Sequence, residues 1–115
     1  MSIALTIPGR LPSLNEMLRM HWAQRIRIKD NMAWVLATSG QPHPSSLHCR
    51  VKLTVYHPTR RFDEDNLHGA CKPILDAMRE AGYIYRDSPK WLELEIKQAL
   101  DHKNPRVEIE VEELP

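Results

Sequence analysis

Three acidic residues stand in a row one residue after two arginines, where the chain changes from a strand-like to a helix-like pattern. The stretch reads "RRFDEDNL", with Arg60 and Arg61 followed by Asp63, Glu64 and Asp65. Asp63 and Asp65 are one residue apart, so in an extended chain their side chains point to the same side. Two carboxylates at that distance repel each other, and the pKa of one of them rises unless a cation neutralises the pair.

A divalent metal ion would remove this repulsion. Hard oxygen ligands favour Mg²⁺, with Mn²⁺ as a substitute, and Mg²⁺ is typically held by one or two carboxylates together with phosphate oxygens and water. The guanidinium groups of Arg60 and Arg61 match the geometry of phosphate oxygens. The stretch therefore predicts a magnesium site beside bound phosphate.

The acids also have a purely structural explanation, in which "DEDN" is a solvated turn whose Asp65 or Asn66 caps the following helix. An EF-hand is excluded, because Leu67 occupies a ligand position and the required Gly is misplaced. His57 and His68 flank the acids and could assist a metal or a leaving group, although a surface histidine is the commoner explanation of each.

Asp87 is the candidate for a third carboxylate. A helix of about 15 residues carries the chain about 22 Å from its start, and an extended return from Gly82 to Asp87 recovers about 17 Å. Asp87 can therefore reach the first turn of the helix, within range of a shared metal site. Asp76 lies one turn beyond Lys72, and we expect it to pair with Lys72 or with Arg79.

Periodicity predicts the elements that must position these residues. Apolar alternation predicts strands at 3–8, 48–58, 91–99 and 106–113, and a spacing of three to four predicts helices at 14–20, 25–38 and 66–82. A capping box of Ser13 and Glu16 starts the first helix, the turn cluster at 101–105 predicts a hairpin, and Pro73 predicts an irregular first turn in the third helix. The fold class is α+β, with about four strands in a small mixed or antiparallel sheet and the helices on one face.

Length and composition bound the chain to one domain, residues 1–115. With 42% hydrophobic and 27% charged residues, we expect one compact core, and the apolar runs fall short of the roughly 20 residues that a membrane span needs. No secretory signal is recognisable. Cys49 and Cys71 have no metal-binding spacing, so we expect them to be reduced core residues of a cytoplasmic protein.

The net charge of +1 hides an asymmetry between the two halves of the chain. Residues 1–61 hold nine Lys and Arg against two acids, a net charge of +7, and residues 62–115 hold seven against 13, a net charge of −6. A positive face around a negative pocket suits an enzyme that binds a polyanion and holds metal ions, and self-neutralisation between the halves explains the charges equally well.

Aromatic and basic residues alternate in the basic half. His21 and Trp22 stand beside Arg19, Arg25 and Arg27, as in a polyanion contact with an aromatic component. A plain amphipathic helix surface would explain the same residues.

Taken together, these stretches resemble the RusA family of Holliday-junction resolvases, in its phage-type branch. The similarity covers nearly the whole chain, in "PGRLPSLNEMLRMHWAQR", "RRFDEDNL" and "CKPILDAMREAGYIYRDS". The family pattern is a DxDN element, then a Lys, an Asp four residues later, a Gly six beyond that and an Asp five further. The matching residues here are Asp63, Asp65, Asn66, Lys72, Asp76, Gly82 and Asp87.

The resemblance implies a small homodimer that binds four-way DNA junctions and cuts two strands symmetrically with Mg²⁺, in DNA recombination and repair in a bacterial or phage-infected cell. By matching position, Asp63, Asp65 and Asp87 would be the metal ligands, and Lys72 a base-type or phosphate-contacting residue. The interval between DxDN and Lys72 is three residues longer than in the family pattern. A DNA-binding protein that does not cleave, and a nuclease acting on other branched DNA, are the alternatives.

Overall fold

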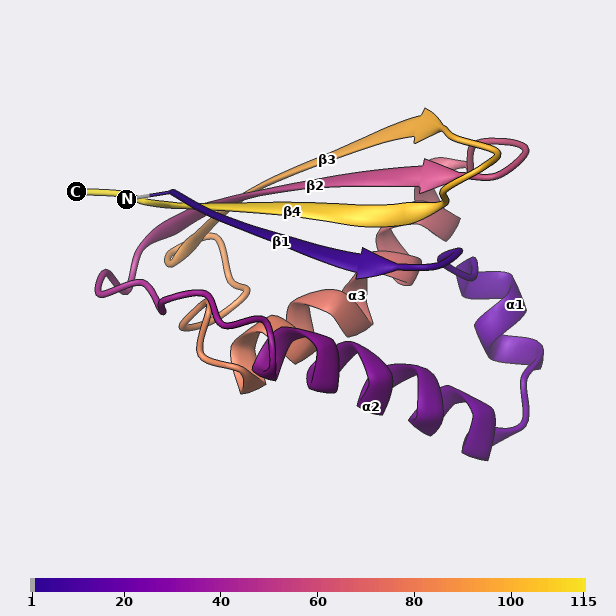
Figure 1. Ribbon diagram of the computed structural model, residues 1–115, viewed down its shortest axis with the longest axis horizontal. Helices are drawn as coiled ribbons and strands as arrows, with labels where there is room; N and C mark the ends of the chain where they lie inside the picture. The colour runs from indigo at the N-terminus through magenta and orange to yellow at the C-terminus, as the bar shows by residue number, and fades with distance from the viewer. Residues whose placement is uncertain (1) are drawn as a thin grey trace.

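A mixed four-stranded sheet carries all three helices on one of its faces (Figure 1). The computed structural model describes residues 2–115. The elements in chain order are β1 (Ser2–Pro8), α1 (Leu14–Arg19), α2 (Trp22–Ala37), β2 (Cys49–His57), α3 (Glu64–Glu80), β3 (Leu92–Leu100) and β4 (Arg106–Glu113). The predicted α+β class, with a small mixed sheet of four strands, is confirmed.

β2 is an interior strand of the sheet, and it pairs antiparallel with β4 and parallel with β3. Leu53 in the middle of β2 lies opposite Ile109 of β4 and Ile96 of β3. A parallel pair needs a crossover connection, and α3 supplies it between β2 and β3. The strand order is β1-β4-β2-β3.

The predicted hairpin between the last two strands is wrong, because β2 lies between β3 and β4. The segment 101–105 passes over the end of β2, where the Asp101 N–H donates to the His57 carbonyl oxygen at 2.8 Å. Two strand spacings are about 10 Å and five extended residues span about 16 Å, so the segment is long enough for this crossing. Its turn-forming residues are the same in either topology, so composition alone did not distinguish the two.

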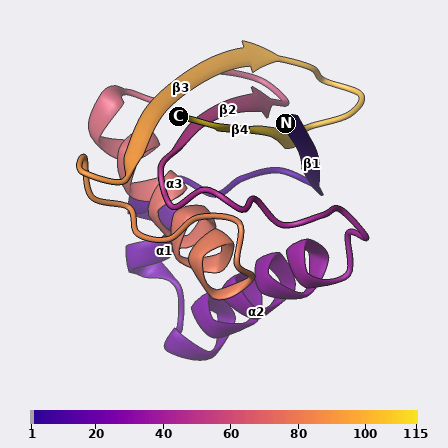
Figure 2. The ribbon, with the colours of Figure 1, turned by 90° about the vertical axis from the view of Figure 1, so that its left-hand side faces the viewer.

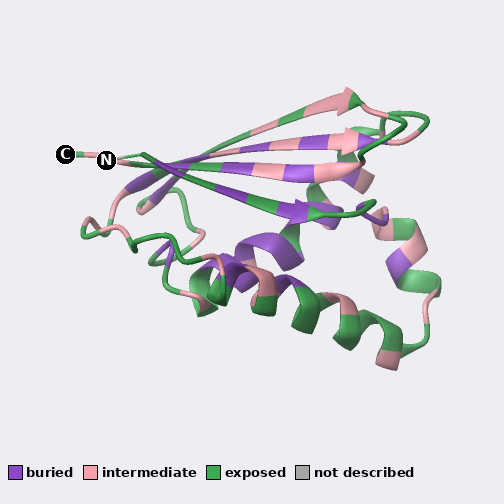
Figure 3. Ribbon diagram, viewed as in Figure 1, coloured by how far each residue is buried: buried purple, intermediate pink, exposed green. Residues whose placement is uncertain are grey.

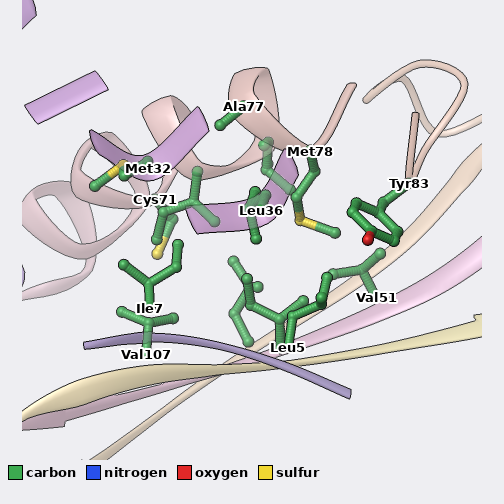
Figure 4. Packing of buried hydrophobic residues seen from close by; sticks show 14 of the residues in the cluster. Leu5, Ile7, Met32, Leu36, Val51, Cys71, Ala77, Met78, Tyr83 and Val107 are labelled. Atoms are coloured by element: carbon green, nitrogen blue, oxygen red, sulfur yellow. The ribbon is translucent and has the colours of Figure 1, made fainter. Parts of the chain in front are cut away.

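The core lies between the sheet and the helices α2 and α3 (Figure 4). Alternate residues of β2 and β4 face the helices and are buried, while those between them face the open side. The stripe of α3 that faces the sheet is also buried; its residues are Leu67, Ala70, Cys71, Ile74 and Met78. Cys49 and Cys71 are buried, free thiols, as predicted, and burial raises the pKa of the Cys71 thiol to about 12.

α3 begins at Glu64 and runs without a break through Pro73 to Glu80, so the predictions of an extended acidic stretch and of an irregular first turn are wrong. Asp63 caps the helix by accepting a hydrogen bond from the Asn66 N–H, which starts the helix at once. A proline inside a helix costs about 3 kcal/mol, and burial of the apolar stripe of α3 offsets that cost. The helix ends as predicted, since Gly82 has a φ of 86° directly after the Ala81 C-cap.

α1 is held against the start of α3. Ser13 and Glu16 form the predicted capping box of α1, and the Asn15 N–H donates to Oδ1 of Asn66 at 3.0 Å. Leu14 packs directly over Gly69, where a Cβ atom would lie 2.6 Å from the Leu14 Cδ2. The absence of a side chain at Gly69 therefore lets the two helices approach.

The helix-facing side of the sheet is buried and its other side is open to solvent (Figure 3). Viewed end on, the sheet curves over the helices (Figure 2). On the open side Arg50 of β2 bridges Glu93 of β3 at 2.9 Å and Glu112 of β4 at 3.3 Å. No helix among residues 2–115 has the length and apolar character needed to cross a bilayer.

Replacing Gly69 with Ala should destabilise the protein, although Ala is normally the better helix former by about 0.5–1 kcal/mol. The added Cβ would lie 2.6 to 2.8 Å from three atoms of Leu14, and overpacking of this kind costs about 1–3 kcal/mol. Thermal unfolding of Gly69→Ala beside His68→Ala, an exposed neighbour in the same helix, measures the effect. A higher melting temperature for Gly69→Ala than for the wild type would contradict the packing described.

Candidate functional site

The carboxyl end of β2 opens into a hollow of about 630 Å³ with four arginines in its lining. Arg10 comes from the segment after β1, Arg19 from α1, and Arg60 and Arg61 from the segment between β2 and α3. We call this site the arginine hollow. Asp63 and Asn66, at the start of α3, form its edge.

Three of the four arginines carry uncompensated charge. Arg10 donates two hydrogen bonds to the Glu16 carboxylate, at 2.9 and 2.8 Å, and this pairing raises the pKa of Arg10 and lowers that of Glu16. Arg19, Arg60 and Arg61 are exposed and form no ion pair with any of the residues that the structure describes. The hollow therefore offers free guanidinium forks, which match phosphate oxygens.

Gln98 of β3 fixes the backbone that carries Arg60 and Arg61. Its Oε1 accepts from the Phe62 N–H at 2.8 Å, and its Nε2 donates to the Phe62 carbonyl oxygen at 3.1 Å. The His57 Nε2 lies 2.8 Å from the same Oε1, and because a carbonyl oxygen only accepts, this nitrogen donates. We call this set of bonds the Gln98 clamp.

His57 belongs to the clamp and is almost fully buried, with 1% of its surface exposed, whereas the sequence favoured a surface position. Burial lowers the pKa of His57, and nearby Arg61 lowers it further against the raising effect of Gln98. His57 is therefore a neutral hydrogen-bond donor that supports the loop. His68 is exposed on α3.

Sequence reasoning missed both Gln98 and Arg10. Gln98 continues the inward-facing positions of its strand after Leu92, Leu94 and Ile96, so the signal was a polar residue at an apolar position of an alternating pattern. Arg10 follows a Pro-Gly turn directly after β1, and no local pattern points to its role.

Asp63 is committed to the helix cap. Its Oδ1 accepts from the Asn66 N–H at 2.9 Å and its Oδ2 accepts from the Asn66 Nδ2 at 3.0 Å. These two hydrogen bonds lower the pKa of Asp63. A helix cap at this stretch was one of the two readings of the sequence, but the capping residue is Asp63 and not Asp65 or Asn66.

Asp65 stands in the first helical turn, where a negative charge interacts favourably with the helix dipole. It is exposed and forms no ion pair or side-chain hydrogen bond within residues 2–115. With Asp63, Glu64 and Asn15 it lines a shallow hollow of about 370 Å³. The available carboxylates therefore lie next to the arginine hollow, at the same end of the molecule.

Lys72 and Asp87 form an ion pair half-way along α3. The Lys72 Nζ also lies 3.7 Å from Asp76, and Asp76 lies 3.8 Å from Arg79, which confirms the predicted pairing of Asp76. The hydrogen bond to Asp87 raises the pKa of Lys72, and the bond to Lys72 lowers the pKa of Asp87. A raised pKa keeps Lys72 protonated, so as placed it is a cation and not a base.

The structure does not bring the three expected metal ligands together. Lys72 follows Asp63 by nine residues, about 13.5 Å along the helix, so its partner Asp87 lies beyond the first turn that we expected it to reach. Within residues 2–115, no group of three or more His, Cys, Asp or Glu is arranged to hold a metal ion.

The side chains at the start of α3 nevertheless suit a Mg²⁺ site in which the protein supplies only part of the ligands. Asp63 and Asp65 supply hard carboxylate oxygens, and Mg²⁺ commonly takes only one or two carboxylates, with phosphate and water as its other ligands. Asp63 and Asp65 therefore fit a Mg²⁺ ion whose remaining ligands are water and the oxygens of a phosphate bound in the arginine hollow. Asp87, paired with Lys72 beyond the first turn of α3, is not part of such a site as placed.

The remaining candidates for polyanion contact lie on α2. His21 caps that helix through Nδ1, which accepts from the Ala23 N–H at 3.2 Å, and Trp22 is 61% exposed. Arg25 and Arg27 are also exposed on α2. None of these four lines the arginine hollow, whereas Arg19, Arg60 and Arg61 do.

No family model matches the chain, and no curated protein matches it either. The RusA resemblance therefore stays a hypothesis drawn from the residues named above.

Gln98→Leu should loosen the segment between β2 and α3. The substitution removes the hydrogen bonds to Phe62 and His57, and leaving buried polar groups without partners costs about 1–3 kcal/mol. We expect a lower melting temperature and faster amide exchange at Phe62. Lys97→Leu, at the neighbouring position on the opposite face of β3, is the control, and equal exchange at Phe62 in both variants would contradict the clamp.

Asp87→Asn should make stability less sensitive to acid. The pKa of Asp87 is lowered in the folded state, so its contribution is present above the unfolded value of about 3.9 and is lost as the pH falls through the folded pKa. Melting temperatures measured from about pH 5 to pH 1 should therefore fall less in Asp87→Asn than in the wild type. Asp65→Asn, which removes a carboxylate without an ion pair, is the control; a wild-type-like slope in Asp87→Asn would contradict the pairing.

Proposed function

We propose that the protein is a Mg²⁺-dependent, structure-selective endodeoxyribonuclease that resolves four-way DNA junctions by paired symmetric nicks. One observation carries the proposal: unpaired arginines at the carboxyl end of β2 lie beside the carboxylates at the start of α3. The RusA resemblance supports the choice of DNA junctions as substrate. The cytoplasm of a bacterial or phage-infected cell is the compartment that this activity requires.

The arginine hollow would bind the DNA backbone. Arg60 and Arg61 stand on a segment whose backbone is tied to β3 through Phe62, so the backbone that carries them is held in place before DNA arrives, and Arg19 adds a third free guanidinium. Contacts to phosphates carry affinity and orientation without reading sequence, and they weaken steeply with salt.

Asp63 and Asp65 would hold Mg²⁺ next to that phosphate. When bound, the ion would lower the pKa of a water molecule and neutralise charge developing on the phosphoryl group. Arg60 and Arg61 would orient the phosphodiester and stabilise its added charge. Lys72, held protonated by Asp87 and Asp76, would act as a cation toward the DNA backbone.

Paired nicks require two copies of this site. A four-way junction has two-fold symmetry, and a homodimer with a two-fold axis presents two identical sites to it. The proposal therefore includes a homodimer as the cutting species.

DNA binding without cleavage is the second candidate function. Both oxygens of Asp63 are engaged by Asn66, and Asp87 is engaged by Lys72. Carboxylates held in this way stabilise the fold whether or not a metal binds. In that case only the arginine hollow would be functional.

Synthetic four-way junctions and linear duplex, each labelled and incubated with and without Mg²⁺, test the proposal. The wild type should nick the junction symmetrically and only with Mg²⁺, and Asp65→Asn should slow cutting about hundredfold or more, because a metal ion supplies several kcal/mol of transition-state stabilisation. Arg61→Ala should weaken binding and lower the salt slope by about one. Lys52→Ala, which removes one positive charge from the open face of the sheet, is the matched control.

Each alternative has its own outcome in this assay. Junction binding without nicks, unchanged by Asp65→Asn, favours the binding protein. Equal cutting of linear duplex, or a preference for flaps, favours a nuclease with another branched substrate. Equal weakening of binding by Arg61→Ala and Lys52→Ala would contradict the assignment of the arginine hollow.

A further inference from the structure

A second hollow, of about 370 Å³, adjoins the arginine hollow between the end of β1 and α2. Most of its lining is apolar, from Ile7, Leu11, Pro12, Met20, Ile28 and Met32. We call it the apolar groove. Its volume lies within the roughly 300–1,000 Å³ of small-molecule sites.

The rim of the apolar groove is polar and carries only positive charge. Arg10 lines both this groove and the arginine hollow. Arg27 and Asn31, one helical turn apart on α2, line the groove from the other side. Neither has an ion pair or a side-chain hydrogen bond within residues 2–115, and no acidic residue lines the groove.

A nucleotide has the complementary chemistry. Its base offers flat apolar faces and a polar edge, and its phosphate offers negative charge within the same residue. Methionine, isoleucine and proline side chains can pack against the faces, and methionine adapts its shape to an irregular ligand. Arg27 and Asn31 could satisfy the polar edge, while the phosphate would meet the cations around Arg10.

Duplex DNA keeps its bases stacked and paired, and so cannot present one to this groove. An unpaired base can be presented where strands separate, as at a branch point, and proteins that take a base out of its stack recover the unstacking energy by enclosing it. The pairing of an apolar groove with a phosphate-binding hollow therefore selects opened strands over linear duplex.

We propose that the apolar groove binds an unpaired nucleobase of a DNA strand whose phosphate lies in the arginine hollow. The inference rests on the proposed function, because it takes the arginine hollow as a DNA-binding site. It goes further by assigning a base-binding subsite and a reason for the preference for branched DNA.

Fluorescence anisotropy with two single-stranded probes tests this inference. One probe is a short oligothymidylate, and the other is an abasic strand of the same length and phosphate charge. The wild type should bind the thymidylate about tenfold more tightly, in line with the 1–3 kcal/mol that one enclosed base typically contributes. Met20→Glu, inside the groove, should remove this preference, and Leu18→Glu, at an exposed residue of α1 that lines neither hollow, should keep it.

Asn31→Asp serves as the second groove variant, because its nearly isosteric change at an exposed position does not disturb packing if Met20→Glu unfolds the chain. Equal binding of both probes by the wild type would overturn the base-binding subsite and leave the phosphate-binding hollow intact. A preference that survives in both groove variants would also overturn it. Failure of both probes to bind at low salt would overturn the arginine hollow as a DNA-binding site, and this inference with it.

Discussion

The parallel pairing of β2 with β3 is the constraint on which the rest of the structure depends. It forces the chain to cross back over one face of the sheet, and α3 makes that crossing with its apolar stripe against β2 and β4. Because α3 must start where β2 ends, the acids at its first turn come to the carboxyl end of the central strand. In open sheets with parallel strands this edge is where ligands usually bind.

The same pairing explains why the candidate site is rigid on one side and adjustable on the other. The register between β2 and β3 places Gln98 near the end of β2. There it forms hydrogen bonds with Phe62 and His57, two residues that line the arginine hollow. The arginine side chains themselves are exposed, and Asp65 has no partner in the described chain. Under the proposed function, a site built this way would recognise phosphate by charge and leave the final geometry to the bound DNA.

The individual helices and strands could be predicted because each depends on a pattern within a short stretch of sequence. Apolar alternation predicted β2 and β4, and Ser13 with Glu16 predicted the start of α1. The strand order could not be predicted, since the turn residues at 101–105 suit a hairpin and a connection across the end of β2 alike. The prediction that the acidic stretch is extended was wrong because the helix start depends on two hydrogen bonds between Asp63 and Asn66, and Asp63, Asp65 and Asn66 are all residue types that can cap a helix. Lys72 and Asp87 were both named, but their ion pair depends on the path of residues 82–87, which no periodicity encodes.

The central claim is that DNA phosphate binds at the carboxyl end of β2. Amide shift changes and line broadening in a ¹H–¹⁵N NMR spectrum, recorded as a small synthetic four-way junction is added without Mg²⁺, test it most directly. The account predicts the largest changes at residues 59–66 and around Arg10 and Arg19. Changes concentrated on the open face of the sheet, near Lys52 and Glu110, with none at 59–66, would contradict it.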